Sequence, residues 1–347
     1  MDKRGFSLNL ISRYRNELFG ISILSVLFLH FAMIYIENFR GSQTITYAVI
    51  RWIRRYFSSC GVDIFVFLSG MGLYYSFFRN SDCIAFYSRR FRRILIPYAI
   101  IGGIFWVHVD LFYRIVGLKR LLLDFTYITF FTEGVNNLWF VFFIGVMYLL
   151  FPLIYYFVHK SRNGMQWFLL FLFIAVIIPA MLYEAMPQMY ININIAVTRV
   201  PVFILGAFVG KYIKAGKLIP HLAVVGMILF GILCRHYVLM EGIKGYINRY
   251  ASSVFAIALM LICTYSMRIA DRAIHIRGIL RFFGKYSLEF YLLNILLWEL
   301  FGEIHWELYR PGRYAVMLCI CAVIAPLLRK WTEKISAVMI RHRWRTG

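Results

Sequence analysis

Long apolar segments recur along the whole chain, and they decide what it can fold into. A membrane core of about 30 Å is crossed by roughly 20 residues of helix. Segments of about this length span residues 18–37, 60–78, 94–116, 138–158, 166–184, 191–213, 218–240, 250–267, 286–303 and 314–335. Hydrophobic residues make up 61% of the chain, well above the roughly 45–50% of a soluble domain. We therefore predict an all-α, polytopic integral membrane protein with about ten transmembrane helices.

The positive charges predict how these helices are oriented. Cytoplasmic loops of membrane proteins carry an excess of Lys and Arg. With the N-terminus inside, 25 of the 38 Lys and Arg lie in cytoplasmic segments and 10 in the opposite loops, while Arg114, Arg199 and Arg235 lie within or at the ends of spans. This predicts cytoplasmic N- and C-termini. The net charge is +22. We interpret the excess Lys and Arg as residues that fix the topology and contact anionic lipid. We therefore expect no nucleic-acid partner.

The chain has no linker, low-complexity tract or repeat, which predicts a single membrane domain over residues 1–347. The second apolar segment is rich in glycine and is compatible with a partly re-entrant segment. The sequence LKRLLLDFTYITFFTEGVNN, between the third and fourth spans, is expected to lie flat in the membrane interface. The six cysteines show no metal-type spacing, so we expect reduced packing residues and no metal site.

An ionisable histidine, His30, lies in the middle of the first apolar segment. Ionisable residues inside a span are costly and mark candidate functional sites, although an isolated histidine is as often satisfied by a backbone carbonyl. At 100° per residue, one helix face carries Arg15, Ser22, His30 and Glu37. Arg15 lies about 22 Å from His30 along such a helix, near the cytoplasmic surface. We expect this face to line the protein interior or a watery cavity.

The sequence FYSRRFRRILIPY, residues 86–98, places four arginines just before a proline-bearing span. They are Arg89, Arg90, Arg92 and Arg93. Such a cluster is either a topology anchor or a phosphate site, because guanidinium groups bind phosphate oxygens in bidentate fashion. The charge count places the cluster in the cytoplasm, where phosphorylated donors are found.

Polar residues also recur within later spans. Ser287, Tyr291 and Asn294 share one face of the ninth span. Residues of this kind either form hydrogen bonds between helices or line a site. Arg199 lies inside the sixth span and needs a carboxylate or phosphate partner, because an unpaired charge in a membrane is costly.

Six segments of the chain carry a resemblance to a known family. In order, they are ISILSVLFLHF, GVDIFVFLSGMGLYYSF, FYSRRFRRILIPY, NNLWFVFFIGVMYLLFPLIYY, RVPVFILGAFVGK and FGKYSLEFYLLNILL. Together they resemble the acyltransferase 3 family of integral-membrane acyltransferases, bacterial proteins of about ten helices that modify cell-surface glycans. Phe19 stands where members commonly have arginine, and Arg15, one turn earlier, is the expected substitute. Asn137 and Asn294 stand where members often have histidine.

The resemblance implies an O-acyltransferase of the bacterial cytoplasmic membrane. It would move an acyl group, acetyl by default, from cytoplasmic acyl-CoA to a sugar hydroxyl of a glycan that is lipid-linked or at the cell surface, such as an exopolysaccharide or O-antigen. His30 would be the general base or a transient acyl carrier, because an imidazole with a pKa of about 6.5 accepts a proton at neutral pH. Acyl-CoA is then a co-substrate, and no bound cofactor is expected.

The candidate residues follow from the same resemblance and from the polar faces. They are His30, Glu37 and Asp63 for catalysis, Arg15, Arg89, Arg90, Arg92 and Arg93 for the acyl donor, and Ser22, Trp139, Arg199, Ser287, Tyr291 and Asn294 for the acceptor or its cavity. Arg90 and Arg93 would hold the donor phosphates, with the other two arginines of the cluster as alternates of the same spacing. Asp63 would orient His30, bind sugar, or serve only the structure of its helix.

Two other classes of protein share some of these features. A transporter or flippase for a glycan or an acylated small molecule would also have ten spans and intramembrane charges, but it is expected to show inverted repeats with broken helices, which the sequence does not display. A different class of membrane acyltransferase with an intramembrane His and Asn would acylate proteins or lipids. The arginine cluster that follows GVDIF argues against that class.

Overall fold

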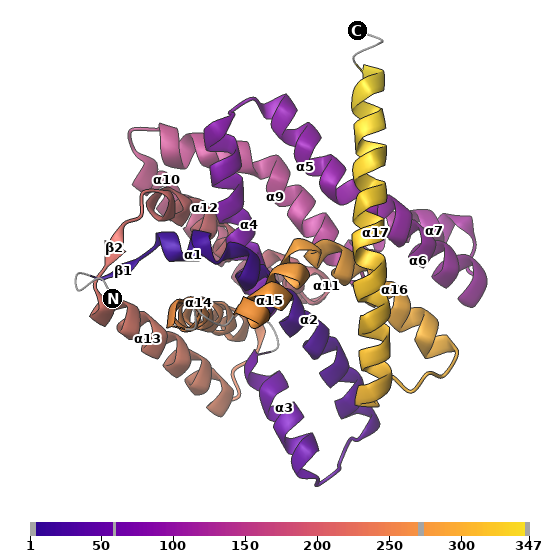
Figure 1. The fold of residues 1–347 in the computed structure, drawn as a ribbon. Helices are drawn as coiled ribbons and strands as arrows, with labels where there is room; N and C mark the ends of the chain where they lie inside the picture. The colour runs from indigo at the N-terminus through magenta and orange to yellow at the C-terminus, as the bar shows by residue number, and fades with distance from the viewer. Residues whose placement is uncertain (1–4, 58–59, 270–273, 344–347) are drawn as a thin grey trace.

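The computed structural model describes residues 5–57, 60–269 and 274–343, and its architecture is helical, as the sequence predicts (Figure 1). The first half contains β1 (Phe6–Ser7), α1 (Asn9–Arg13), α2 (Arg15–Asn38), α3 (Ile45–Phe57), α4 (Cys60–Arg79), α5 (Cys83–Pro97), η1 (Tyr98–Gly102), α6 (Gly103–Val107), η2 (His108–Tyr113), α7 (Leu118–Phe125), α8 (Ile128–Thr132), α9 (Trp139–Tyr155) and η3 (Tyr156–Lys160). The second half contains α10 (Gly164–Ala185), α11 (Pro187–Val197), α12 (Val200–Lys214), β2 (Leu218–Ile219), α13 (His221–Met240), α14 (Gly245–Ile269), α15 (Ile274–Lys285), α16 (Ser287–Glu303) and α17 (Pro311–Arg343). Four cations of the topology count, Lys3, Arg4, Arg272 and Arg345, lie outside the described residues.

Nine helical segments in the described part of the chain are long and apolar enough to cross a membrane. α16 is shorter, at 17 residues, but it is still within the range that can span a bilayer. With α16 included, each of the ten predicted apolar segments overlaps a helix. The predicted membrane fold is therefore confirmed.

Several predicted span boundaries and one predicted loop differ from the structure. The helix of the third span starts at Cys83 instead of residue 94, because Asp82 Oδ1 accepts hydrogen bonds from the backbone N–H groups of Ile84 (2.9 Å) and Ala85 (3.2 Å) and so caps a new helix. The sixth span is divided into α11 and α12 at residues 198–199. The segment 38–59, expected as a loop, contains the helix α3.

The glycine-rich second segment is a continuous helix, α4, so the partly re-entrant interpretation is wrong. Its glycines allow close helix packing instead. A Cβ on Gly70 would lie 2.4 Å from the carbonyl oxygen of Phe203, and a Cβ on Gly206 would lie 2.2 Å from that of Phe67. Small residues at both positions let the backbones of α4 and α12 touch, as in many membrane helix pairs. α4 therefore lies at the centre of the bundle.

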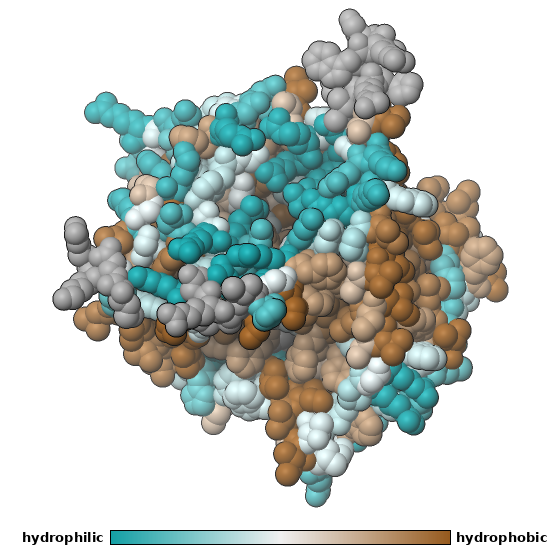
Figure 2. Space-filling model, viewed as in Figure 1, coloured by the Kyte–Doolittle hydropathy of each residue, from teal (hydrophilic) through white to brown (hydrophobic). Residues whose placement is uncertain are grey.

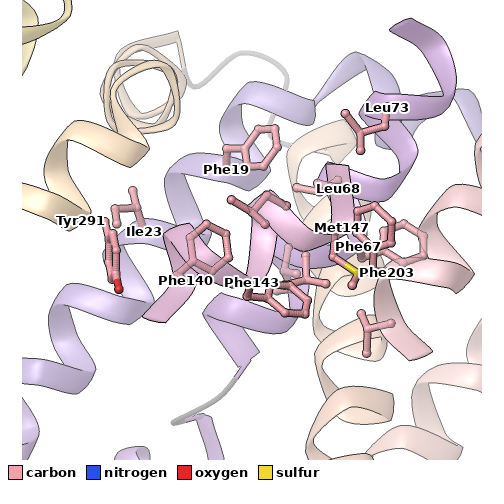
Figure 3. Close-up of a cluster of buried hydrophobic side chains, with 14 of the residues drawn as sticks. Phe19, Ile23, Phe67, Leu68, Leu73, Phe140, Phe143, Met147, Phe203 and Tyr291 are labelled. Atoms are coloured by element: carbon pink, nitrogen blue, oxygen red, sulfur yellow. The ribbon is translucent and has the colours of Figure 1, made fainter. Parts of the chain in front are cut away.

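Buried aromatic and aliphatic side chains from α2, α4, α9, α12 and α16 meet in one core cluster (Figure 3). The outer helices are different. Only 17% of the apolar stretch of α10 is buried, and 28% of those of α13 and α17. Figure 2 shows hydrophilic residues gathered over the upper left and centre of one face, and hydrophobic residues over its lower and right-hand parts. The exposed apolar helices are the ones that would face lipid.

Two short strands connect the N-terminal segment to the loop before α13. β1 pairs with β2 in antiparallel fashion, with Phe6 opposite Ile219 and Ser7 opposite Leu218. The topology prediction puts both segments on the same side of the membrane, and the pairing is consistent with it.

Candidate active site

His30 is the sixteenth of the 24 residues of α2 and is joined to α16 by a short hydrogen bond. Its Nδ1 is 2.5 Å from Oδ1 of Asn294. The side chain of Asn294 is fully buried and also donates from Nδ2 to the hydroxyl of Tyr314 (3.2 Å). The Tyr314 hydroxyl donates in turn to the backbone carbonyl of Leu27 (2.7 Å). One polar relay thus connects α2, α16 and α17.

The direction of this relay decides which nitrogen of His30 carries the proton. The Tyr314 hydroxyl uses its only hydrogen on Leu27, so it accepts from Asn294 and directs the amide nitrogen toward itself. Oδ1 of Asn294 therefore faces His30, and an amide oxygen only accepts. Nδ1 of His30 must be the protonated nitrogen, which leaves the lone pair on Nε2 free to accept a proton or an acyl group.

A cavity of about 870 Å³, which we call the His30 cavity, opens beside this relay. The ring of Trp298 lies 5.1 Å from that of His30 and lines the same cavity. Other polar residues of the lining are Arg51, Arg54, Arg55, Asn136, Asn137, Arg199, Arg235, Asn248, Arg249, Ser287, Tyr291 and Glu299. The volume is typical of a site for a small ligand, and its walls combine an ionisable imidazole with many guanidinium groups.

A second cavity, the arginine cavity, lies toward the other end of α2. Its volume is about 350 Å³, and its charged lining residues are Arg15, Arg90, Arg93, Arg281, Lys285, Glu289 and Arg329. Arg15 and Arg90 also line a more open, adjoining cavity of about 490 Å³ together with Arg79 and Lys214. Room for the guanidinium of Arg15 comes from Gly72, where a Cβ would lie only 2.6 Å from that guanidinium.

The two cavities share part of their lining. Phe65, Phe140, Ser287 and Leu288 line both. The rings of Phe65 and Phe140 lie 5.2 Å apart and perpendicular. Phe140 packs edge-on against Tyr291, with the ring centroids 5.8 Å apart; Figure 3 labels both residues. A thin wall of mostly apolar side chains therefore separates the histidine from the arginine cluster.

Comparison with known proteins adds one decisive finding. A family model described as an acyltransferase domain matches residues 20–329, nearly the entire chain. The chain belongs to the acyltransferase 3 family. The resemblance read from the sequence is confirmed, and the protein is a membrane acyltransferase. Comparisons with curated proteins and with solved structures gave no match.

In this acyltransferase, Asp63 and Arg199 form a buried ion pair. Arg199 Nε lies 3.0 Å from Asp63 Oδ1, and the two side chains are 4% and 2% exposed. Ser253 Oγ donates to the other carboxylate oxygen (3.3 Å), and the guanidinium of Arg199 lies over the ring of Trp139 at 5.2 Å. Arg199 thus has the carboxylate partner that the sequence analysis requires. Among the described residues, the polar contacts of Asp63 are with Arg199 and Ser253 and not with His30.

The other predicted site residues divide between the cavities and positions outside them. Within the cluster on α5, Arg90 and Arg93 line the arginine cavity, whereas Arg89 and Arg92 do not. Ser22 is buried, and its hydroxyl donates to the carbonyl of Leu18 (2.8 Å). Glu37 is exposed near the end of α2 and is not part of the His30 cavity lining. The His30 cavity lining includes Trp139, Ser287 and Tyr291, which were expected for the acceptor or its cavity. Asn294 is not part of this lining and contacts the His30 ring instead.

Five arginines of the His30 cavity lining were not predicted as site residues. Arg51, Arg54 and Arg55 belong to α3, which was expected as a loop, and Arg235 and Arg249 belong to the ends of α13 and α14. The signal was present in the segment 45–57, where arginines and large apolar residues recur at helical spacing. It was also not foreseen that Nε2 of His108 contacts a carboxylate oxygen of Glu303 at 2.8 Å.

Proposed function

We propose that the acyltransferase moves an acyl group, by default acetyl, from cytoplasmic acyl-CoA to a hydroxyl of a lipid-linked or cell-surface glycan in the bacterial cytoplasmic membrane. Membership of the family identifies the reaction as acyl transfer. Donor and acceptor are inferred from the chemistry of the two cavities and from the resemblance described above.

The observation that carries the proposal is the His30–Asn294–Tyr314 relay at the edge of a cavity. It presents an unprotonated Nε2, and among the described residues this nitrogen has no hydrogen-bond partner. A sugar hydroxyl within reach of Nε2 would give up its proton as its oxygen attacks the thioester carbonyl. The carbon–sulfur bond then breaks, and the proton leaves with the CoA thiol. Alternatively, Nε2 attacks the thioester carbonyl first, the carbon–sulfur bond breaks and CoA leaves as its thiolate. The sugar hydroxyl then attacks the acyl group, the carbon–nitrogen bond breaks, and the hydroxyl proton neutralises the thiolate.

The arginine cavity supports the choice of a phosphorylated donor. Its lining carries six cations, Arg15, Arg90, Arg93, Arg281, Lys285 and Arg329, and one carboxylate, Glu289. Guanidinium groups suit the phosphates of CoA, and all of these segments fall on the predicted cytoplasmic side. The shared wall of Phe65, Phe140, Ser287 and Leu288 would then lie between the bound CoA and His30.

Acyl transfer in membranes tests the proposal. Membranes containing the wild type, His30→Ala or Arg162→Gln, at matched expression, receive radiolabelled acetyl-CoA and the glycan fraction of the host. We expect label on the glycan with the wild type, a loss of about 100-fold or more with His30→Ala, and near wild-type transfer with the control Arg162→Gln, whose side chain is exposed. Transfer that persists without His30 would refute its catalytic role.

A further inference from the structure

The His30 cavity carries far more positive charge than acyl transfer to a neutral sugar needs. In the described part of the chain, six arginines line it, from α3, α12, α13 and α14 or their flanking turns, and so does one acidic residue, Glu299. Among the described residues, Arg199 is the only one of the six that forms an ion pair, with Asp63. Five guanidinium groups therefore face one cavity without a carboxylate partner.

Three of these arginines are fixed by hydrogen bonds to neutral groups. Arg235 is 3% exposed and donates to Asn248 Oδ1 (2.6 Å) and to the carbonyl of Arg55. Arg55 donates to the carbonyl of Leu239 (2.5 Å), and Arg249 donates to Asn194 Oδ1 (3.2 Å). These bonds hold the positive charges in place but do not neutralise them.

Donor groups are left over after these contacts. Nε of Arg235 is buried and has no hydrogen-bond partner within residues 5–57, 60–269 and 274–343. Among the described residues, Arg51 and Arg54 of α3 make neither a hydrogen bond nor an ion pair. A buried donor without a partner costs free energy, and converging guanidinium groups repel one another. Both costs are removed when an anion with several oxygens enters the cavity.

The position of α3 indicates where such an anion would come from. One face of this helix is apolar and exposed, with Ile45 83%, Val49 48% and Trp52 54% exposed. An amphipathic helix with an exposed tryptophan is typical of the membrane interface. Arg51 and Arg54, on another face of the same helix, line the cavity and would lie at the level of lipid phosphates.

We propose that the acyl acceptor carries a phosphate or diphosphate group, and that Arg51, Arg54, Arg235 and Arg249 bind it in the His30 cavity. This inference deepens the proposed function and rests on it. A diphosphate matches the number of guanidinium donors better than a single carboxylate does, because it presents more oxygens and more negative charge. The phosphate either links the sugar to a membrane lipid or belongs to the glycan itself.

Binding measurements on the purified full-length protein in dodecyl maltoside test this without acyl transfer. The probes are inorganic pyrophosphate, farnesyl diphosphate, farnesol and glucuronate, measured by calorimetry. The variants are Arg51→Gln/Arg54→Gln in the His30 cavity, Arg90→Gln/Arg93→Gln in the arginine cavity, and Arg40→Gln as an exposed cation outside both. The melting temperature of each variant without probe identifies any that fail to fold.

We expect pyrophosphate and farnesyl diphosphate to bind in the His30 cavity, and both to lose about tenfold or more in affinity there with Arg51→Gln/Arg54→Gln but not with Arg40→Gln. Arg90→Gln/Arg93→Gln should weaken only a second, separate class of pyrophosphate site, the one in the arginine cavity. Tighter binding of farnesyl diphosphate than of pyrophosphate would assign the phosphate to a lipid link, and equal binding would assign it to the glycan. Undiminished binding by the folded α3 variant, glucuronate binding as tight as pyrophosphate, or farnesol binding as tight as farnesyl diphosphate would each overturn the proposal. Binding with no acyl transfer would instead refute the proposed function.

Discussion

At the scale of the residue, the chemistry of His30 is set by partners that are distant in the sequence. The imidazole contacts Asn294 on α16, which is oriented by Tyr314 on α17. The sequence predicts that His30 and Asn294 belong to polar helix faces, because both are polar residues within otherwise apolar segments. It does not predict that the two side chains touch. They are 264 residues apart in the sequence, and their contact depends on how α2 and α16 pack together.

The relay gives a prediction for Asn294. Replacing Asn294 with Leu keeps a side chain of similar size but removes the acceptor that fixes the proton on Nδ1 of His30. We expect kcat for acyl transfer to fall by about 10–100-fold, as for other residues that orient a functional imidazole, with little change in the KM for the donor. Tyr314→Phe, which keeps Asn294 but removes the hydroxyl that orients its amide, should have a smaller effect. An Asn294→Leu enzyme with unchanged kcat would contradict the orienting role.

At the scale of the element, the sequence predicts which segments form helices better than it predicts where each helix begins and ends. The apolar segments mark nearly every span because roughly 20 apolar residues have few alternatives to crossing a membrane. The start of α5 is set instead by the cap at Asp82, and α3 is amphipathic rather than uniformly apolar. Local capping and interfacial helices leave only weak patterns, and the missed arginines of α3 are a direct consequence.

The α4–α12 contact gives a prediction at this scale. Gly70→Ala places a methyl group 2.4 Å from the carbonyl oxygen of Phe203, so the helices must separate. We expect a loss of about 1–3 kcal/mol in stability and a lower melting temperature in detergent. Gly226→Ala on α13 is the matched control, because its Cβ would meet no atom of the described residues within 4 Å, and it should be neutral or slightly stabilising. Equal melting temperatures for the two variants would contradict this packing.

The α5 helix gives a second prediction, for the acyl donor. Arg90 and Arg93 line the arginine cavity, whereas Arg89 and Arg92 of the same cluster do not. We expect Arg90→Gln/Arg93→Gln to raise the KM for acyl-CoA by about tenfold or more, since each charge-assisted hydrogen bond is worth about 1.5–3 kcal/mol. Arg89→Gln/Arg92→Gln should raise it less, and the exposed Arg162→Gln should leave it unchanged. Equal effects of the two double variants would argue for a general charge effect instead of a site.

At the scale of the whole molecule, two cavities of different chemistry lie toward opposite ends of α2 and share one wall. The segments around the arginine cavity fall on the predicted cytoplasmic side, and those around the His30 cavity fall on the opposite side. This arrangement predicts that donor and acceptor approach from different faces of the membrane. The acyl group would then move from the arginine cavity to the His30 cavity through the shared wall of Phe65, Phe140, Ser287 and Leu288.

Acyl transfer in sealed membrane vesicles of known orientation tests this central claim most directly. Radiolabelled acetyl-CoA is supplied outside either inside-out or right-side-out vesicles that contain the wild type or His30→Ala, and label on the glycan is measured. We predict transfer only when acetyl-CoA meets the cytoplasmic face, and a loss of that transfer in His30→Ala. Equal transfer from both faces, or transfer that does not require His30, would contradict a two-sided acyltransferase built around this histidine.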